Sequence, residues 1–128
     1  MSLSVRDLMP MFSVNDSIDG ARVDYQTLWQ RKNLLLVSLP PADPTSERYL
    51  ESLAAQAAVL RAQDTAFIVT TDMVPGIPRP GVVVADRWGE IYHVAEASDA
   101  AALPGTDDLL EWLQYVRSEC PECQGETR

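Results

Sequence analysis

The segment 33–39 (Asn-Leu-Leu-Leu-Val-Ser-Leu) constrains the fold most, because it is almost entirely apolar and a helix start follows it closely. Such a run is typical of a strand that is covered on both faces of its sheet. Asp43 is suited to cap the helix, Pro44 to occupy its first position, and Glu47 to lie at the positive end of its dipole. A buried strand that leads into a helix in this way predicts an α/β fold.

Strands and helices alternate along the rest of the chain. The helix after the apolar run has a stripe that should face the sheet, at Leu50, Leu53, Ala57 and Leu60. Further strands are predicted at residues 66–71, 81–86 and 90–95, and a last helix from Thr106. At the N-terminal end we expect a hairpin of residues 11–14 and 21–25, then one or two helical turns at 27–31.

The composition fits one compact domain of 128 residues. A net charge of −9 argues against nucleic acid and anionic membranes as partners, because both repel an acidic surface. The chain has no apolar run of membrane-spanning length, and residues 1–7 lack the apolar core of a signal peptide. We therefore expect a cytoplasmic protein, where a Cys-x-x-Cys pair is more often redox-active or metal-binding than a structural disulfide.

Several short patterns resemble, in their order and spacing, the redoxin proteins, a group that includes the peroxiredoxins. They are Pro10-x-Phe12, Asp19-Gly20, Leu28 before Arg31-Lys32, Pro80 six residues before Asp86, and Asp86-Arg87-Trp88-Gly89-Glu90-Ile91. The resemblance implies a thioredoxin-like sandwich, a central mixed sheet flanked by helices, for a domain at 1–118, with a tail at 119–128. It also implies a cis bond before Pro80, which in this fold shapes the edge where partners bind.

The loop after the first core strand departs from the redoxin pattern, because it holds no cysteine. Asp43-Pro44-Thr45 resembles a Cys-Pro-Thr motif in which Asp43 replaces the cysteine, and a carboxylate neither attacks peroxides nor forms mixed disulfides. This loop and Pro80 should meet at one sheet edge, where open α/β sheets bind ligands. The candidates for a polar pocket that binds a ligand or partner there are Asp43, Thr45, Ser46, Arg79 and Pro80. Alternatively, Asp43 is only a helix cap and Arg79 a solvated loop residue.

A second departure is the missing helix before the strand that follows Pro80. Only residues 73–79 fill that interval, which is long enough to cross two strand spacings. One face of the sheet then loses a cover, so the outward residues of the strand at 66–71 are predicted to be bare. Apolar surface of that kind usually finds a partner, so we expect a homodimer or another protein contact.

Cys120 and Cys123, in a Cys-Pro-Glu-Cys motif, are the only cysteines of the chain. They follow the end of the last predicted helix, where the dipole disfavours a thiolate, and Glu119 and Glu122 add negative charge. Three interpretations stay open: a tail without a dedicated role, a redox-active or disulfide-forming pair, and a four-cysteine zinc site shared by a dimer. Apart from that zinc, no cofactor is predicted.

The remaining residues singled out are aromatic. His93 is interpreted as a surface residue of an edge strand rather than as a catalytic base. Trp29, Trp88 and Trp112 are predicted to pack in the core or on the hairpin, with a contact role for Trp88 at the turn tip as the alternative.

The leading functional hypothesis is a noncatalytic, thioredoxin-like binding or regulatory module with a degenerate active-site loop. The alternatives are a thiol-disulfide oxidoreductase that acts through Cys120 and Cys123, and the zinc-clipped dimer. If the protein is an enzyme, we expect a thiol-disulfide oxidoreductase or a peroxiredoxin-like antioxidant.

Overall fold

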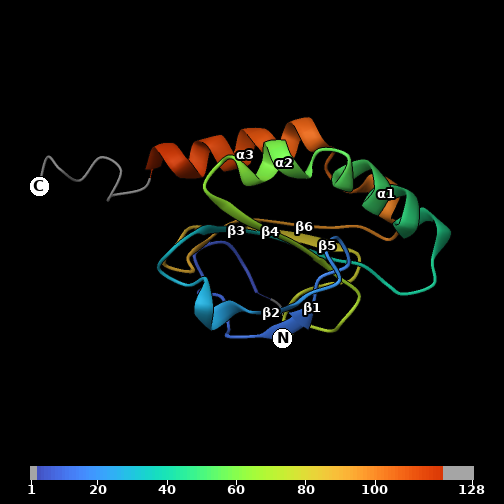
Figure 1. Cartoon of the computed structure of the whole chain (residues 1–128), viewed down its shortest axis with the longest axis horizontal. Coiled ribbons are helices and arrows are strands. Elements are labelled where there is room, and N and C mark those ends of the chain that lie inside the picture. The colour runs from blue at the N-terminus through green and yellow to red at the C-terminus, as the bar shows by residue number, and fades with distance from the viewer. Residues whose placement is uncertain (1–2, 120–128) are drawn as a thin grey trace, which may run out of the picture.

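The computed structural model describes residues 3–119, and its centre is a four-stranded mixed sheet with the order β4-β3-β5-β6. The strands are β3 (Asn33–Ser38), β4 (Thr65–Thr70), β5 (Gly81–Ala85) and β6 (Ile91–Glu96). β3 runs parallel to β4 and antiparallel to β5, and β5 runs antiparallel to β6. Helices cover one face of the sheet and the N-terminal hairpin lies on the other (Figure 1). The predicted α/β sandwich is confirmed, and each strand lies within one residue of its predicted bounds.

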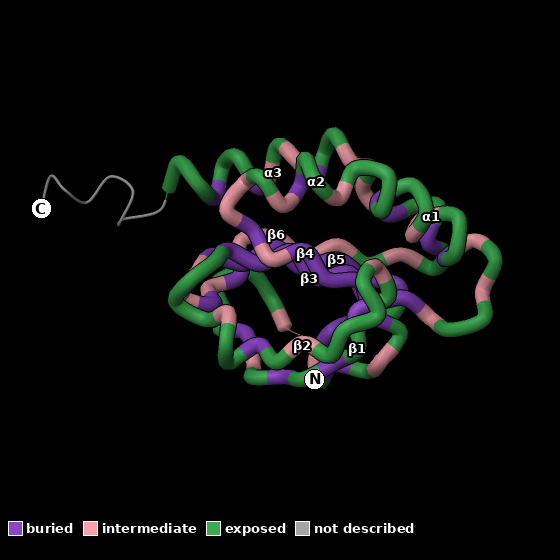
Figure 2. Tube along the Cα trace, viewed as in Figure 1, coloured by how far each residue is buried: buried purple, intermediate pink, exposed green. Residues whose placement is uncertain are grey.

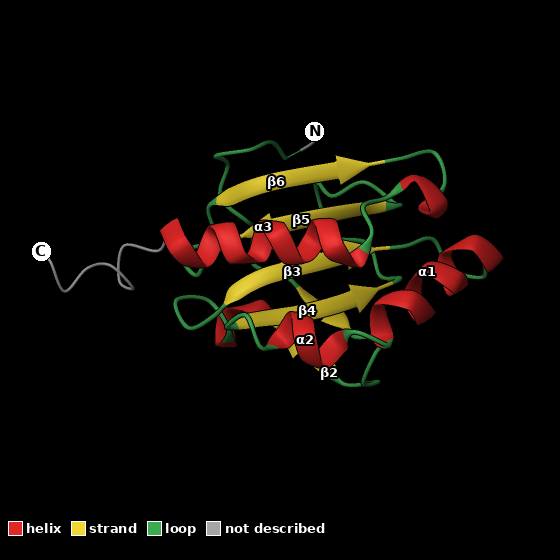
Figure 3. Cartoon of the chain, turned by 90° about the horizontal axis from the view of Figure 1, so that it is seen from above, coloured by secondary structure: helices red, strands yellow, loops and turns green. Residues whose placement is uncertain are grey.

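The helical layer lies above the sheet, with α3 across its middle and α2 over β4 (Figure 3). Its elements are α1 (Pro44–Ala54), α2 (Ala57–Arg61) and α3 (Thr106–Glu119). The single helix predicted for the first two is wrong, because Gln56 leaves helical geometry at φ −113° and ψ 16°. The break turns the chain, so that α1 lies against the 3-10 helix η2 (Ala100–Ala102) and α2 against β4. Among residues 3–119, no helix combines the length and apolar character needed to cross a bilayer.

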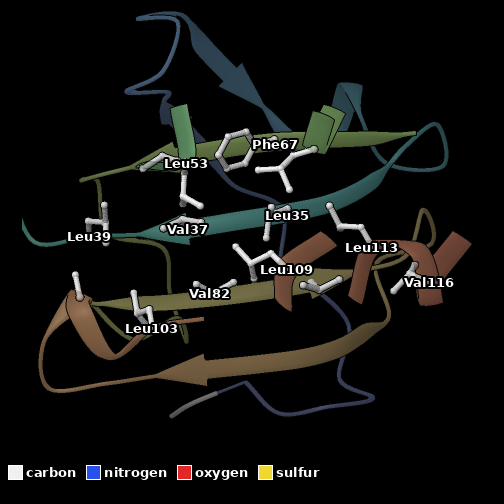
Figure 4. Packing of buried hydrophobic residues seen from close by; sticks show 14 residues of the cluster. Leu35, Val37, Leu39, Leu53, Phe67, Val82, Leu103, Leu109, Leu113 and Val116 are labelled. Atoms are coloured by element: carbon white, nitrogen blue, oxygen red, sulfur yellow. The ribbon is translucent and has the colours of Figure 1, made fainter. Parts of the chain in front are cut away.

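The main core fills the space between the helices and the sheet (Figure 4). Leu53 and Leu60 of the helical stripe are fully buried, and Leu50 and Ala57 pack against the cluster from its margin. They meet alternate residues of the strands and one stripe of α3, namely Leu35, Val37, Phe67, Val82, Val84, Leu109, Leu113 and Val116. The central strands β3 and β5 are buried from end to end, whereas the edge strand β6 is mostly half-buried and the helices are exposed on their outer side (Figure 2).

The other face of the sheet is not bare, and that prediction is wrong. Ile68 of β4, an outward residue of this kind, is only 2% exposed. A second apolar cluster covers it, formed mainly by the N-terminal segment and the loop before β5, with Met9, Phe12, Val14, Tyr25, Val74 and Ile77. These residues take the place of the missing helix, so the domain closes this face within one chain.

The N-terminal hairpin consists of β1 (Ser13–Asn15) and β2 (Arg22–Asp24), as predicted. The helical turns expected at 27–31 are wrong, since a single 3-10 turn, η1 (Tyr25–Thr27), follows β2 under an Asp24 cap. This geometry buries Tyr25 completely and stacks it on Phe12, with 5.0 Å between ring centroids. Trp29, predicted to face inward, instead lies at the surface with 37% exposure.

The outer edge of β4 is closed by side chains and loop backbone. The guanidinium of Arg61 donates to the carbonyl of Phe67. The carboxylate of Asp16 accepts from the amide of Val69, whose carbonyl accepts from the amide of Ser17 at 2.6 Å. Because both bonding directions are occupied at Val69, no further strand can add to β4 there.

The outer edge of β6 is closed only where the strand begins. Ile91 donates to the carbonyl of Asp7 and accepts from the amide of Arg6, and Leu8 forms a bridge with Glu90. Over Tyr92–Glu96, the described part of the chain supplies no backbone hydrogen bond from a further segment beyond β5. Within residues 3–119, the sheet therefore has one closed edge, at β4, and one edge that is open over Tyr92–Glu96 of β6.

Candidate functional site

The edge at the carboxyl end of β3 is where the sequence places its candidate pocket. Ser38, the last residue of β3, pairs with Gly81, the first residue of β5, so the loops that flank them meet at one edge. The peptide bond between Arg79 and Pro80 is cis, which confirms the prediction for Pro80. Pro80 is buried at this edge.

Asp43 is held as the cap of α1. Its Oδ2 accepts from the amide of Ser46 at 3.2 Å and from the Ser46 hydroxyl at 2.6 Å. Ser46 is 3% exposed, so the pair is fixed against the body of the domain. The predicted cap role is confirmed, and the carboxylate serves the helix start rather than pointing freely into solvent.

Thr45 and Arg79 each bond close to their own position in the chain. The Thr45 hydroxyl accepts from the guanidinium of Arg48 at 3.3 Å. Arg79 donates to the carbonyl of Thr71 at 2.8 Å, across its own loop. The fold thus brings the two loops to one edge, while Asp43 and Thr45 are bonded to residues in the first turns of α1 and Arg79 is bonded across its own loop.

Cys120 and Cys123 lie outside the described residues. α3 ends at Glu119, directly before them. Their redox or zinc-binding role stays a prediction. Within residues 3–119, no three His, Cys, Asp or Glu side chains are grouped to hold a metal ion.

The Asp86–Ile91 hairpin shows why the redoxin-like motif has its residue types. The Asp86 Oδ1 accepts from the amides of Trp88 and Glu90, each at 2.9 Å, and organises the turn. Burial is the main cause that raises the pKa of Asp86 above its ordinary value. Gly89 has φ +86°, and an added Cβ would lie 3.3 Å from the Tyr25 hydroxyl. The carbonyl of Trp88 accepts from the Trp29 indole at 3.0 Å, which fixes this surface indole on the turn.

An aromatic groove of about 780 Å3, which was not predicted, lies between β6, η2 and α3. It is lined by His93, Ala95, Ala102, Leu103, Pro104, Asp108, Glu111, Trp112 and Tyr115. The His93 and Trp112 rings are stacked, with centroids 4.4 Å apart and planes inclined by 10°. Tyr115 meets Trp112 edge-on at 5.9 Å. His93 is on an edge strand as predicted, but half-buried, and burial lowers its pKa.

The sequence contains a weak signal for this groove. Asp108, Glu111, Trp112 and Tyr115 recur at helical spacing, beside the buried stripe of α3. His93 and Ala95 alternate on β6, as residues on one face of a strand do. Neither pattern indicates that α3 and β6 lie next to each other.

A smaller hollow of about 320 Å3 continues the groove toward the N-terminal segment. It is lined by Val5, Arg6, Glu90, Ile91, Tyr92, Trp112, Tyr115 and Glu119. Trp112 and Tyr115 line both hollows, so together they form one long depression beside β6.

Comparisons with known proteins give a likeness in structure. No family model matches the chain, and the search of curated proteins found no match. The reduced 2-Cys peroxiredoxin of Plasmodium vivax is similar at a TM-score of 0.75 and 12% identity, over 94% of this chain and 84% of that one.

Two further solved structures agree. The mitochondrial 2-Cys peroxiredoxin of Plasmodium falciparum gives a TM-score of 0.68 at 9% identity, over 88% of this chain and 94% of that one. The yeast mitochondrial 1-Cys peroxiredoxin gives 0.71 at 11% identity, over 96% and 79%. At such identities a likeness shows the fold alone. This chain has the thioredoxin-like fold of the peroxiredoxins.

Proposed function

We propose that this chain is a noncatalytic binding module with a redoxin-like fold and a degenerate active-site loop. The observation that carries the proposal is the state of Asp43. Its carboxylate is engaged by the amide and hydroxyl of Ser46 at the start of α1, in a loop without sulfur. A capped carboxylate of this kind stabilises a helix and offers no nucleophile for thiol chemistry.

The edge around Pro80 is the surface that we propose for binding. The buried pairing of Ser38 with Gly81 fixes the backbone there, while Thr45 and Arg79 supply polar groups beside it. The partner is a protein, with a second copy of this chain as the simplest case. The face of β4 that was predicted to be uncovered gives no support for a homodimer, because the N-terminal segment covers it, so the contact is proposed at this edge.

Peroxide consumption tests the noncatalytic role. With dithiothreitol as reductant, the full chain should consume hydrogen peroxide no faster than its C120S/C123S variant. A rate that exceeds this variant's would overturn the proposal in favour of the thiol-disulfide enzyme. Equal rates with both cysteines titratable as free thiols agree with the binding module.

Metal analysis of the freshly purified protein tests the zinc-clipped dimer. Free, unreactive thiols at Cys120 and Cys123, in a protein that contains no zinc, agree with the binding module. About one zinc per dimer, lost in C120S/C123S together with the dimer mass, would favour a structural site of four cysteines instead. Light scattering of R79A against R31A tests the edge at Pro80, since both variants remove one exposed arginine but Arg31 precedes β3, at the end of the sheet opposite to Pro80. A dimer fraction that falls in R79A alone is the expected result.

A further inference from the structure

We propose that the open edge of β6 and the aromatic groove together bind an extended, basic segment of a partner protein. The segment adds a strand beside β6 and places a lysine or arginine side chain in the groove. This inference does not rest on the noncatalytic role, because it uses other residues.

The two edges of the sheet are unequally protected. β4 is closed by Arg61, Asp16 and Ser17, whereas beyond Ile91 the outer side of β6 has no further backbone partner among the described residues. A strand presents alternate N–H and C=O groups on its outer side, and an extended peptide satisfies them by adding to the sheet. Residues Tyr92 to Glu96 thus offer a ready pairing site.

The depression beside that edge has a shape that suits an extended chain. His93 and Ala95 line the groove from β6, so a strand paired with β6 would carry its alternate side chains over the same hollow. Trp112 and Tyr115 connect the groove with the smaller hollow. A long depression parallel to a strand suits an extended chain better than a compact small molecule.

The depression is also acidic. Asp108 and Glu111 line the groove, and none of its lining residues is a lysine or arginine. The smaller hollow adds Glu90 and Glu119, and its one cation, Arg6, lies 3.5 Å from Glu90. Carboxylates next to the faces of indole and phenol rings favour an ammonium or guanidinium group.

The same charge argues against two other occupants. The chain beyond Glu119 carries Glu122 and Glu126 against a single Arg128, and a second copy carries a net charge of −9. Either one would bring negative charge to an acidic groove. Both are outcomes that the experiment below detects.

The test uses a fluorescein-labelled peptide of sequence Lys-Val-Lys-Val-Lys-Val and the full chain, with binding followed by anisotropy. We expect saturable binding to the wild type and binding weakened about tenfold by E111K, because a lining carboxylate becomes a cation. The control E51K changes an exposed helical glutamate on α1 by the same charge and should change binding less than about twofold. The peptide methylated on alternate backbone nitrogens should not bind, since it cannot pair with β6.

Amide spectra locate the contact. Shifts confined to residues 92–96 and to the Trp112 indole are expected. The proposal is overturned by equal affinity of E111K and E51K, by full binding of the methylated peptide, or by shifts centred on residues 43–46 and 79–81. It is also overturned if the amides of residues 92–96 shift when the chain alone is diluted, which would place a second copy on β6, or if removing residues 120–128 is needed to expose the groove. Each of these results leaves the peroxide assay unaffected, so the two proposals fail separately.

Discussion

Asp16 accepts a hydrogen bond from the amide of Val69 at 3.2 Å and so ties the hairpin loop to the outer edge of β4. Asp16 is 3% exposed and also accepts from the amide of Ile18, with the Arg61 guanidinium 3.5 Å away. A buried carboxylate with these partners both orders the loop and protects the strand.

Replacing Asp16 by alanine should therefore lower the free energy of unfolding by about 2–4 kcal/mol, because the Val69 amide loses its acceptor and Arg61 its buried partner. Urea denaturation measures the loss. Asp19→Ala is the matched control, since Asp19 also pairs with Arg61 at 3.1 Å but is exposed; its loss should stay below about 1 kcal/mol. Equal losses for the two variants would contradict the account.

Gly81 has no room for a side chain. A Cβ there would lie 2.5 Å from the carbonyl oxygen of Pro78, a backbone atom that cannot step aside. Gly81→Ala should therefore cost about 2–4 kcal/mol and disturb the edge at Pro80. Gly105→Ala is the control, because no atom lies within 4 Å of an added Cβ, and thermal melting should place it within about 0.5 kcal/mol of the wild type.

The cap of α1 is tested at Asp43. Asp43→Ala should lower the free energy of unfolding by about 1 kcal/mol, because the amide of Ser46 loses its acceptor. Asp43→Ser keeps an acceptor at the cap and should retain most of the stability. If urea denaturation gives the two variants the same free energy of unfolding, the cap does not explain the Asp43 carboxylate, which then has another role in this loop.

His93 should titrate below its ordinary pKa of 6.5, because burial beside Trp112 disfavours the charged imidazolium. Between the lowered pKa and 6.5, the unfolded chain binds more protons than the folded one. The free energy of unfolding therefore rises with pH in that window. The contribution of His93 is complete above pH 6.5 and is lost as the pH falls through the lowered pKa.

Proton NMR on the chain without a histidine tag measures this pKa directly, since His93 is the only histidine. Trp112→Ala uncovers the imidazole and should move the pKa toward 6.5, whereas Trp88→Ala, at the β5–β6 turn, should not. His93→Gln should remove this part of the pH dependence. A pKa above 6.5 in the wild type would contradict the burial argument.

Local chemistry made much of the fold predictable. The apolar run of β3, the Asp43 cap and the turn residues of the Asp86 hairpin act over a few positions, and each appears where the sequence indicates. The cis bond before Pro80 followed from the redoxin resemblance rather than from local chemistry.

What could not be predicted depends on contacts between distant segments. Periodicity shows that Ile68 needs a cover but not that Met9 and Tyr25 provide it. Trp29 and Tyr25 are both aromatic residues near one turn, and only the backbone path after β2 decides which of them is buried. The groove could not be predicted for the same reason. It lies between β6 and a face of α3 that carries polar residues such as Asp108 and Glu111.

The closed edge of β4 sets an upper limit on assembly through the sheet. A molecule with two free margins can extend without end, as fibrils do. Among the described residues only β6 leaves an edge open, so one added segment occupies the single free edge of the domain. Extension of the sheet then stops at that segment, and a few bonds at Phe67 and Val69 protect the domain from open-ended fibril growth.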